Sequence, residues 1–240
     1  MTLDLSTYEV LTFDCYGTLV DWESGIAAAL GELLAAHGLE GERERLLELY
    51  SGFEPQAQAG VFKPYREVLA EVVDRFGVHF GFVPSPAERG CLADSLPGWP
   101  LFPDTRAALE RLAARYRLAV LSNIDDDLFA GTARRLGVPL DGVITAQQVG
   151  SYKPAPGHFE AAMERLAPRE RLLHVAQSLF HDVAVARGLG IATVWVNRRG
   201  EGEGSATGSG ATPPSTARPD LEVPDLATLA ALADGSGPST

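Results

Sequence analysis

Near its start the sequence runs Val10-Leu11-Thr12-Phe13-Asp14-Cys15-Tyr16-Gly17-Thr18-Leu19-Val20, a short apolar segment that ends in an aspartate. A glycine follows Asp14 three residues later. Parallel strands of an α/β sheet are buried on both faces, and ligands bind beyond their carboxyl ends. The segment therefore predicts a buried strand that places the Asp14 carboxylate at the ligand-binding edge. A carboxylate held there can attack an electrophile and form a covalent aspartyl intermediate.

The chain downstream alternates between apolar runs and helical patterns. Helices are expected at 104–115, 127–136, 158–166 and 182–189, between strands at 118–121, 142–144, 172–176 and 192–196. A last short strand at 221–225 and a helix at 226–232 return to the core. Such alternation implies βαβ units, and therefore an α/β fold with a doubly wound, Rossmann-like parallel sheet.

A second region, between the first strand and Pro100, has helical patterns only. Its expected helices span 24–37, 42–50, 65–76 and 86–94. We predict a helical cap at 21–98, inserted into an α/β core made of 1–20 and 99–233. A cap over the edge of the sheet excludes water and supplies substrate contacts. Residues 200–219, rich in Gly, Ser, Thr and Pro, are expected to form a flexible loop.

Composition restricts the partners. With 45% hydrophobic and 22% charged residues, the chain is typical of soluble globular proteins. The net charge of -12 argues against nucleic acid, which needs a basic surface. No apolar run approaches a membrane span, no secretory signal pattern is present, and two cysteines suggest no disulfide framework. We expect a cytoplasmic protein with no membrane partner, and the sequence leaves a homodimer open.

Further polar side chains follow the other strands at the same sheet edge. Ser122 and Asn123 offer neutral donors for anionic oxygens, although singly they are typical of a cap and a turn. Lys153, before a proline, can neutralise the nucleophile and a substrate anion, whereas an isolated loop lysine is usually solvated. Asp182 opens a helix, where an acid is often only a capping residue.

Taken together and in this order, Asp14, Thr18, Ser122, Lys153 and Asp182 resemble the motifs of the haloacid dehalogenase-like hydrolase superfamily. Within it, the chain is most similar to the 2-haloacid dehalogenase (type II) branch with a helical cap. Tyr16, where phosphatases of the superfamily have a second aspartate, and the ending Trp195-Val196-Asn197-Arg198 strengthen that resemblance.

The resemblance implies a reaction. Asp14 attacks the halogen-bearing carbon in an SN2 step, and water then hydrolyses the ester at the carboxylate carbon. Lys153 balances charge, Thr18 orients groups and Asp182 orients Lys153 or water. Substrate contacts fall to Tyr16, Ser122, Asn123, Gln177 and Ser178. The resemblance further implies a small anionic substrate, with no metal or other cofactor.

The sequence departs from that branch at substrate-contact positions. The branch carries a cap arginine that grips the substrate, and the matching segment, 48–54, contains none. The tyrosine that follows the lysine motif is Phe159 here, and the serine and asparagine before the last acid are Gln177 and Leu179.

Two alternatives stay open beside the dehalogenase hypothesis. A magnesium-dependent phosphatase of the same superfamily would have to function without an acid at position 16 and with Gln177 in place of a metal-holding acid. Asp14 and Asp182 alone make a poor magnesium site. A non-catalytic member would keep the fold as a binding protein. Of the histidines, His174 is expected to pack in the core and His181 is a candidate to face the site.

Overall fold

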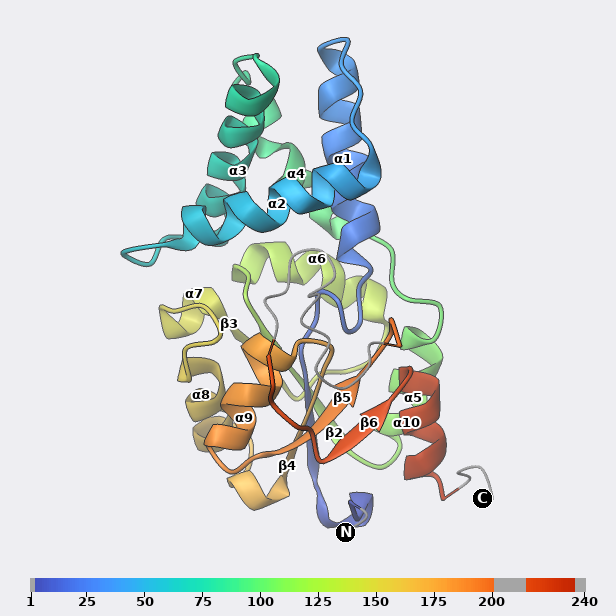
Figure 1. The fold of residues 1–240 in the computed structure, drawn as a ribbon. Helices are drawn as coiled ribbons and strands as arrows, with labels where there is room; N and C mark the ends of the chain where they lie inside the picture. The colour runs from blue at the N-terminus through green and yellow to red at the C-terminus, as the bar shows by residue number, and fades with distance from the viewer. Residues whose placement is uncertain (1–2, 201–214, 236–240) are drawn as a thin grey trace.

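The computed structural model describes residues 3–200 and 215–235, and at its centre lies a six-stranded parallel sheet (Figure 1). The strand order is β3-β2-β1-β4-β5-β6, and neighbouring strands run parallel throughout. This arrangement confirms the predicted doubly wound sheet. The strands are β1 (Val10–Phe13), β2 (Arg117–Ser122), β3 (Gly142–Thr145), β4 (Leu172–Ala176), β5 (Ala192–Val196) and β6 (Leu221–Val223).

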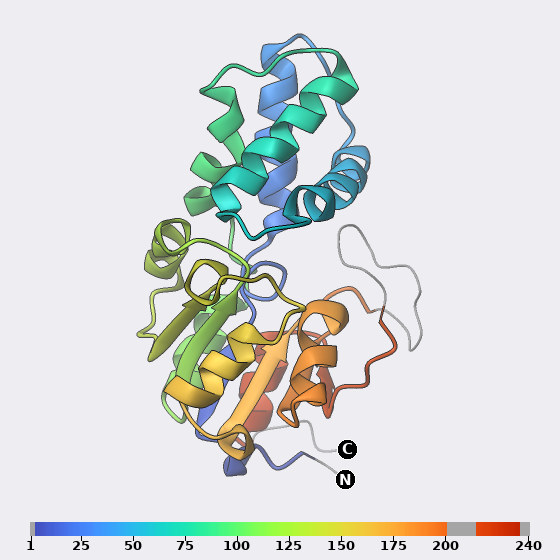
Figure 2. The ribbon, with the colours of Figure 1, turned by 90° about the vertical axis from the view of Figure 1, so that its left-hand side faces the viewer.

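Helices cover both faces of the sheet (Figure 2). The helices of the α/β core are α5 (Thr105–Ala113), which precedes β2, and α6 (Asp126–Leu136), α7 (Ala146–Val149), α8 (Gly157–Arg165), α9 (Ala184–Gly188) and α10 (Leu226–Ala233), which come after β2. Side chains of β1 alternate between two hydrophobic clusters: Leu11 and Phe13 pack with α5 and α10, whereas Val10 packs with α8 and α9. Because the strand is buried on both faces, its apolar run is almost continuous.

A separate group of helices lies above the carboxyl ends of the strands (Figure 1). It consists of α1 (Trp22–Ala36), α2 (Arg43–Gln58), α3 (Tyr65–Phe80) and α4 (Cys91–Ser95), with short 3-10 turns at Glu88–Gly90 and Leu96–Gly98. The fold is therefore an α/β sheet with an inserted helical cap, as predicted. The α1 helix begins directly after its N-cap residue Asp21, and the bounds of the cap at 21–98 stay a prediction.

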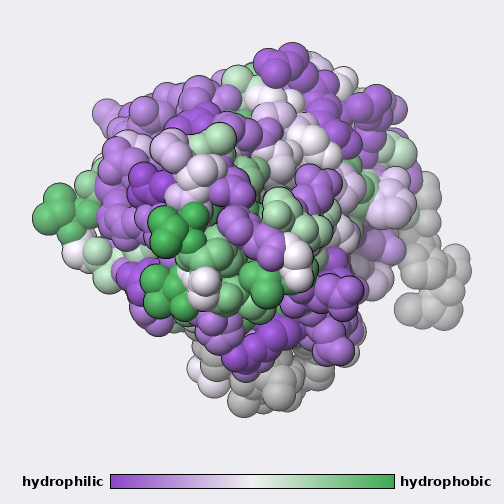
Figure 3. Space-filling model, turned by 90° about the horizontal axis from the view of Figure 1, so that it is seen from above, coloured by the Kyte–Doolittle hydropathy of each residue, from purple (hydrophilic) through white to green (hydrophobic). Residues whose placement is uncertain are grey.

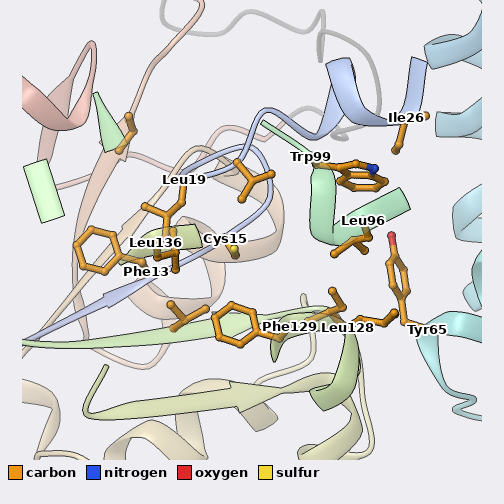
Figure 4. Packing of buried hydrophobic residues seen from close by; sticks show 14 of the residues in the cluster. Phe13, Cys15, Leu19, Ile26, Tyr65, Leu96, Trp99, Leu128, Phe129 and Leu136 are labelled. Carbon is orange, nitrogen blue, oxygen red and sulfur yellow. The ribbon is translucent and has the colours of Figure 1, made fainter. Parts of the chain in front are cut away.

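Hydrophobic packing continues from the sheet into the cap (Figure 4). Phe13 and Leu19 belong to the same buried cluster as Leu96, Trp99 and Ile26. Full burial of such side chains contributes ~1.5–3 kcal/mol each. The cap is therefore held on the sheet by apolar contacts and not only by its two connections.

Three expected elements differ from the structure. The α2 helix runs to Gln58 rather than ending at residue 50, although Gly52 and Pro55 disfavour helix locally. Burial of Tyr50 and Ala57 against neighbouring helices outweighs that local cost. The helix expected at 86–94 is broken into a 3-10 turn and α4, and the one expected at 182–189 begins with a π-helical turn, Leu179–Val183. Most of the predicted loop 200–219 lies outside the described residues.

The outer surface seen from above is largely hydrophilic, with a group of hydrophobic residues near the middle of the view (Figure 3). The large hydrophobic side chains that are most exposed are Val61, Val78 and Val83. Within the described part of the chain, no helix is both long and apolar enough to cross a membrane.

Candidate active site

The predicted residues converge on the ammonium group of Lys153 at the carboxyl edge of the sheet. Its Nζ donates to Asp14 Oδ1 at 2.9 Å, to Asp182 Oδ1 at 2.6 Å and to the carbonyl oxygen of Leu121 at 2.9 Å. An ammonium has three protons, so all three are used. Lys153 is only 2% exposed and is therefore not a solvated loop lysine.

Charge in this cluster is fixed by the pairing. Burial by itself would lower the pKa of Lys153, but the carboxylates of Asp14 and Asp182 outweigh it and hold the pKa above its ordinary range. Burial by itself would raise the pKa of Asp182. The ammonium of Lys153 and a hydrogen bond from His174 instead hold it well below its usual range. At neutral pH the site therefore contains a lysine cation and an ionised Asp182.

Thr18 holds the second oxygen of Asp14. The Thr18 hydroxyl donates to Asp14 Oδ2 at 2.7 Å and accepts from the backbone N–H of Gln177 at 2.9 Å. Gly17 makes this return of the chain possible because its φ of 102° is unfavourable for other residues. Both oxygens of Asp14 are thus oriented by the protein.

Asn123 positions the lysine through its main chain. Its Oδ1 accepts from the Lys153 N–H at 2.7 Å, and its Nδ2 donates to the Lys153 carbonyl at 3.1 Å. Ser122 is different: among the residues that the structure describes, none lies within hydrogen-bond distance of its buried Oγ. That residue lines the cavity beside Asp14, and its hydroxyl is available to a substrate oxygen.

The other predicted contacts also line the cavity. The Tyr16 hydroxyl lies 2.9 Å from Thr132 Oγ1, and its ring meets Trp99 edge-on with centroids 5.8 Å apart. Ser178 Oγ accepts from the backbone N–H of His181 at 2.9 Å, which stabilises the π-helical turn. Gln177 lines the same cavity.

The histidines follow two patterns. His174 is buried against Phe159, as expected, but its Nε2 also lies 3.0 Å from Asp182 Oδ1, where it donates. No sequence pattern predicts this contact, because a histidine within an apolar strand is usually only packed. His181 lines the cavity, and burial lowers its pKa, which keeps the imidazole neutral.

These residues face a cavity of about 110 Å³ between the sheet edge and the cap. The cap supplies Trp22, Ile26, Tyr50, Glu54, Gln58, Tyr65 and Leu96, and Trp99 follows it. Sequence reasoning did not assign these residues, because helical periodicity identifies buried faces without distinguishing the core from a cavity wall. A second, wider cavity of about 510 Å³ shares Glu54, Gln58, Lys153 and His181 with the first.

The donor set does not favour a metal ion. Within residues 3–200 and 215–235, no group of three or more His, Cys, Asp or Glu side chains is placed to hold one. The Lys153 ammonium bridges Asp14 and Asp182, the two carboxylates that a cation would need. Hard divalent cations require several oxygen ligands, and one oxygen of each of these two carboxylates is already engaged by the Lys153 ammonium.

Comparison with known proteins agrees with this geometry. The family model of haloacid dehalogenase-like hydrolases matches residues 8–190. The chain belongs to this hydrolase family. Among curated members, it is 27% identical over 194 residues to (S)-2-haloacid dehalogenase 1 of Pseudomonas sp. strain CBS-3, covering 78% of this chain and 83% of that protein. It is 28% identical over 202 residues to (S)-2-haloacid dehalogenase 4A of Burkholderia cepacia, covering 78% and 82% respectively.

Solved structures of haloacid dehalogenase-like hydrolases share the fold. The L-2-haloacid dehalogenase of Xanthobacter autotrophicus, with chloropropionic acid covalently bound, superposes with a TM-score of 0.79 at 22% identity, covering 95% of this chain and 99% of that one. A magnesium-bound member, the putative hydrolase YfnB of Bacillus subtilis, gives a TM-score of 0.75 at 17% identity, covering 95% and 99%. The same architecture therefore occurs in a dehalogenase and in a magnesium-bound hydrolase, so the fold alone does not distinguish the two chemistries and the site residues must.

Proposed function

We propose that this protein hydrolyses a carbon–halogen bond, with Asp14 as the nucleophile and an ester of Asp14 as the intermediate. The observation that carries the proposal is the Asp14 carboxylate, which lines the cavity while Lys153 and Thr18 each hold one of its oxygens. Such an arrangement fixes the direction of the nucleophile and places a cation beside it. The curated relatives are named as 2-haloacid dehalogenases, so 2-haloacids are the first substrates to test.

In the first step, an Asp14 oxygen forms a bond to the halogen-bearing carbon, and the halide leaves with the electron pair. The loss of charge on Asp14 leaves Lys153 paired with Asp182. The unpartnered Ser122 hydroxyl is placed to donate to a carboxylate oxygen of a 2-haloacid.

In the second step, water attacks the carboxyl carbon of the ester and releases the alcohol. Asp182 and the neutral imidazole of His181 line the cavity and can orient this water, and the imidazole can take up its proton. Overall, one water is consumed, and a hydroxy acid, a halide ion and a proton are formed. No metal or other cofactor enters this scheme.

The test is a single turnover with excess enzyme in ¹⁸O-labelled water containing a chelator, using 2-chloropropionate and longer 2-haloacids. Halide release accompanied by label in the Asp14 carboxyl group supports the proposal. Label in the product alcohol would mean that water attacks the halogen-bearing carbon directly. Halide release without label in Asp14 would show that Asp14 is not the nucleophile.

A magnesium-dependent phosphatase is the competing hypothesis from the sequence. Burial raises the pKa of Tyr16, and its hydroxyl is directed to Thr132, so the site does not favour it as a substitute for a catalytic acid. Phosphate release from a generic ester only with magnesium, and no halide release, would favour this alternative. The absence of both halide release and phosphate release would favour a non-catalytic binding protein. The cytoplasmic location and the homodimer stay predictions.

A further inference from the structure

The cap wall of the cavity contains an acidic side chain that the proposed chemistry does not use. Glu54, in the last turns of α2, lines the cavity together with Tyr50 and Tyr65. The Tyr65 hydroxyl donates to Glu54 Oε1 at 2.6 Å, and the Tyr50 hydroxyl lies 3.3 Å from the same oxygen and 2.9 Å from the Tyr65 hydroxyl. We call these three residues the Glu54 triad.

Proton counting shows what the Glu54 triad can offer. Each tyrosine has a single hydroxyl proton. The proton of Tyr65 is directed to Glu54, and that of Tyr50 is directed to Glu54 or to Tyr65. Glu54 Oε2 accepts no hydrogen bond from any residue in the described ranges. The triad therefore presents acceptors to the cavity, and a substrate group that meets it must be a donor.

The charges around the cavity lead to the same requirement. Its lining contains the carboxylates of Asp14, Asp182 and Glu54 but a single lysine, Lys153, which both Asp14 and Asp182 already engage. No arginine of the described chain lines it. A carboxylate placed against Glu54 would add another negative charge with no cation to balance it.

Aromatic rings complete the surroundings. Trp22, Tyr50, Tyr65 and Trp99 all line the cavity, and the Trp22 and Tyr50 rings pack with centroids 5.8 Å apart. In Figure 4 the Tyr65 hydroxyl points toward the side of the cluster that holds Trp99. Aromatic faces attract a nearby cation electrostatically. A carboxylate with a free oxygen, in a cavity lined by aromatic rings, is a combination suited to an ammonium ion.

We propose that the Glu54 triad binds an ammonium group of the substrate, with Glu54 Oε2 as its acceptor. Together with the Ser122 hydroxyl on the opposite wall, this assigns the substrate class as a small halogenated acid that carries an amino group. The inference rests on the proposed function for the halogen, and on the Glu54 triad alone for the ammonium.

The protonation of Glu54 is compatible with this role. Burial raises the pKa of Glu54, while the hydrogen bonds from Tyr65 and Tyr50 favour its charged form. An ammonium ion next to Oε2 would favour the carboxylate further.

The test measures binding without turnover. The probes are unreactive pairs that differ by one amino group: propanoate and 3-aminopropanoate, butanoate and 4-aminobutanoate, pentanoate and 5-aminopentanoate. Because Trp22 and Trp99 line the cavity, tryptophan fluorescence reports binding, and calorimetry confirms it. In the unmodified protein, we expect at least one amino acid to bind ~10-fold or more tightly than its parent acid.

Three variants locate the acceptor. Glu54→Gln keeps an oxygen for Tyr65 but removes the charge, and should reduce the preference to within ~2-fold. Glu48→Gln, an exposed carboxylate on the same helix that pairs with Arg45, should leave it unchanged. Asp14→Asn should also leave a preference for the amino group. A thermal unfolding scan checks that each variant is folded.

The outcomes separate this inference from the proposed function. If the preference depends on Glu54 but no halide is released from any haloacid, the ammonium site stands and the dehalogenase proposal fails. If halide is released but the amino group adds no affinity, the ammonium site is wrong. Loss of the preference in Asp14→Asn but not in Glu54→Gln, or no binding by any probe, would also overturn it.

Discussion

The cavity has carboxylates both on its sheet-side wall and on its cap-side wall, but only those on the sheet side are paired with a cation. On the sheet side, Asp14 and Asp182 share the Lys153 ammonium, which is buried with them. On the cap side, Glu54 is held by two neutral phenols and has no cation. Pairing keeps the sheet-side charges stable and directed for chemistry, whereas the missing cation on the cap side leaves a charge that a ligand can satisfy.

Asp14→Asn removes the reactive group of the sheet-side wall and should have the largest effect. Turnover should fall at least ~1000-fold because an amide does not readily form the ester. Initial rates of halide release measure it, with Asp141→Asn as a control for a surface aspartate that pairs with Arg117. Near-normal activity of Asp14→Asn would move the chemistry to another residue.

Lys153→Met makes the sheet-side wall resemble the cap-side wall by removing the cation. Without the ammonium, the two carboxylates repel each other and Asp14 loses the donor that orients one of its oxygens, so turnover at neutral pH should fall ~100-fold. Removing one partner of a buried ion pair should also lower the free energy of unfolding by about 3–5 kcal/mol. Initial rates of halide release and denaturant titration test the two effects, and an unchanged rate would show that Lys153 does not hold the nucleophile.

Asp182 on the sheet-side wall and Glu54 on the cap-side wall should become protonated at different pH values. The pKa of Asp182 is held well below its ordinary value, so its contribution to stability is present above its unfolded pKa and is lost only as the pH falls through the lowered folded value. Burial shifts the pKa of Glu54 in the opposite direction, so Glu54 becomes neutral at a higher pH than Asp182.

We therefore expect the ~10-fold preference for amino-bearing probes to decline on acidification while the protein is still folded. Fluorescence titrations of 4-aminobutanoate and butanoate between neutral pH and the onset of unfolding measure it. A preference that persists until the protein unfolds would contradict an ionised Glu54 as the acceptor.

Tyr16→Phe should have the smallest effect. The hydroxyl is directed to Thr132, so its loss should remove one hydrogen bond, worth about 1 kcal/mol of unfolding free energy, and change turnover less than ~10-fold. Thr132→Val provides the matched control from the other side of this bond. A loss of more than ~100-fold in Tyr16→Phe alone would assign the phenol a chemical role, as a proton donor has.

Much of the sheet-side wall could be predicted from the sequence because its residues lie at or beyond the carboxyl ends of parallel strands. Asp14 and Ser122 are at strand ends, and Lys153 and Asp182 lie in the connections that follow β3 and β4. An apolar run followed by Asp14, and the order of Ser122, Lys153 and Asp182 after it, determine which side chains share an edge once the strands are parallel. The contact of Asn123 with the Lys153 backbone could not be predicted in the same way, because it depends on the path of a loop rather than on periodicity.

The cap-side wall could not be predicted, for two physical reasons. Gly52 and Pro55 indicate a helix that ends early, yet α2 continues to Gln58 because tertiary packing outweighs local propensity, and this places Glu54 at the cavity. The contact between Tyr50 and Tyr65 joins two helices, so no local pattern contains it. The sequence shows that 48–54 contains no arginine, but it does not show which cap side chains line the cavity in its place.

The continuous apolar cluster between sheet and cap has a consequence for how the molecule loses its structure. Since Phe13, Leu96 and Ile26 belong to one packed interior, the cap has no separate core that could melt while the sheet persists. Denaturation should then follow a single cooperative transition, with circular dichroism and the fluorescence of Trp99 changing together. Rotation of the cap away from the sheet would expose this apolar cluster to water. We therefore expect substrate and product to enter and leave through the wider cavity, which is lined by Glu54 and His181.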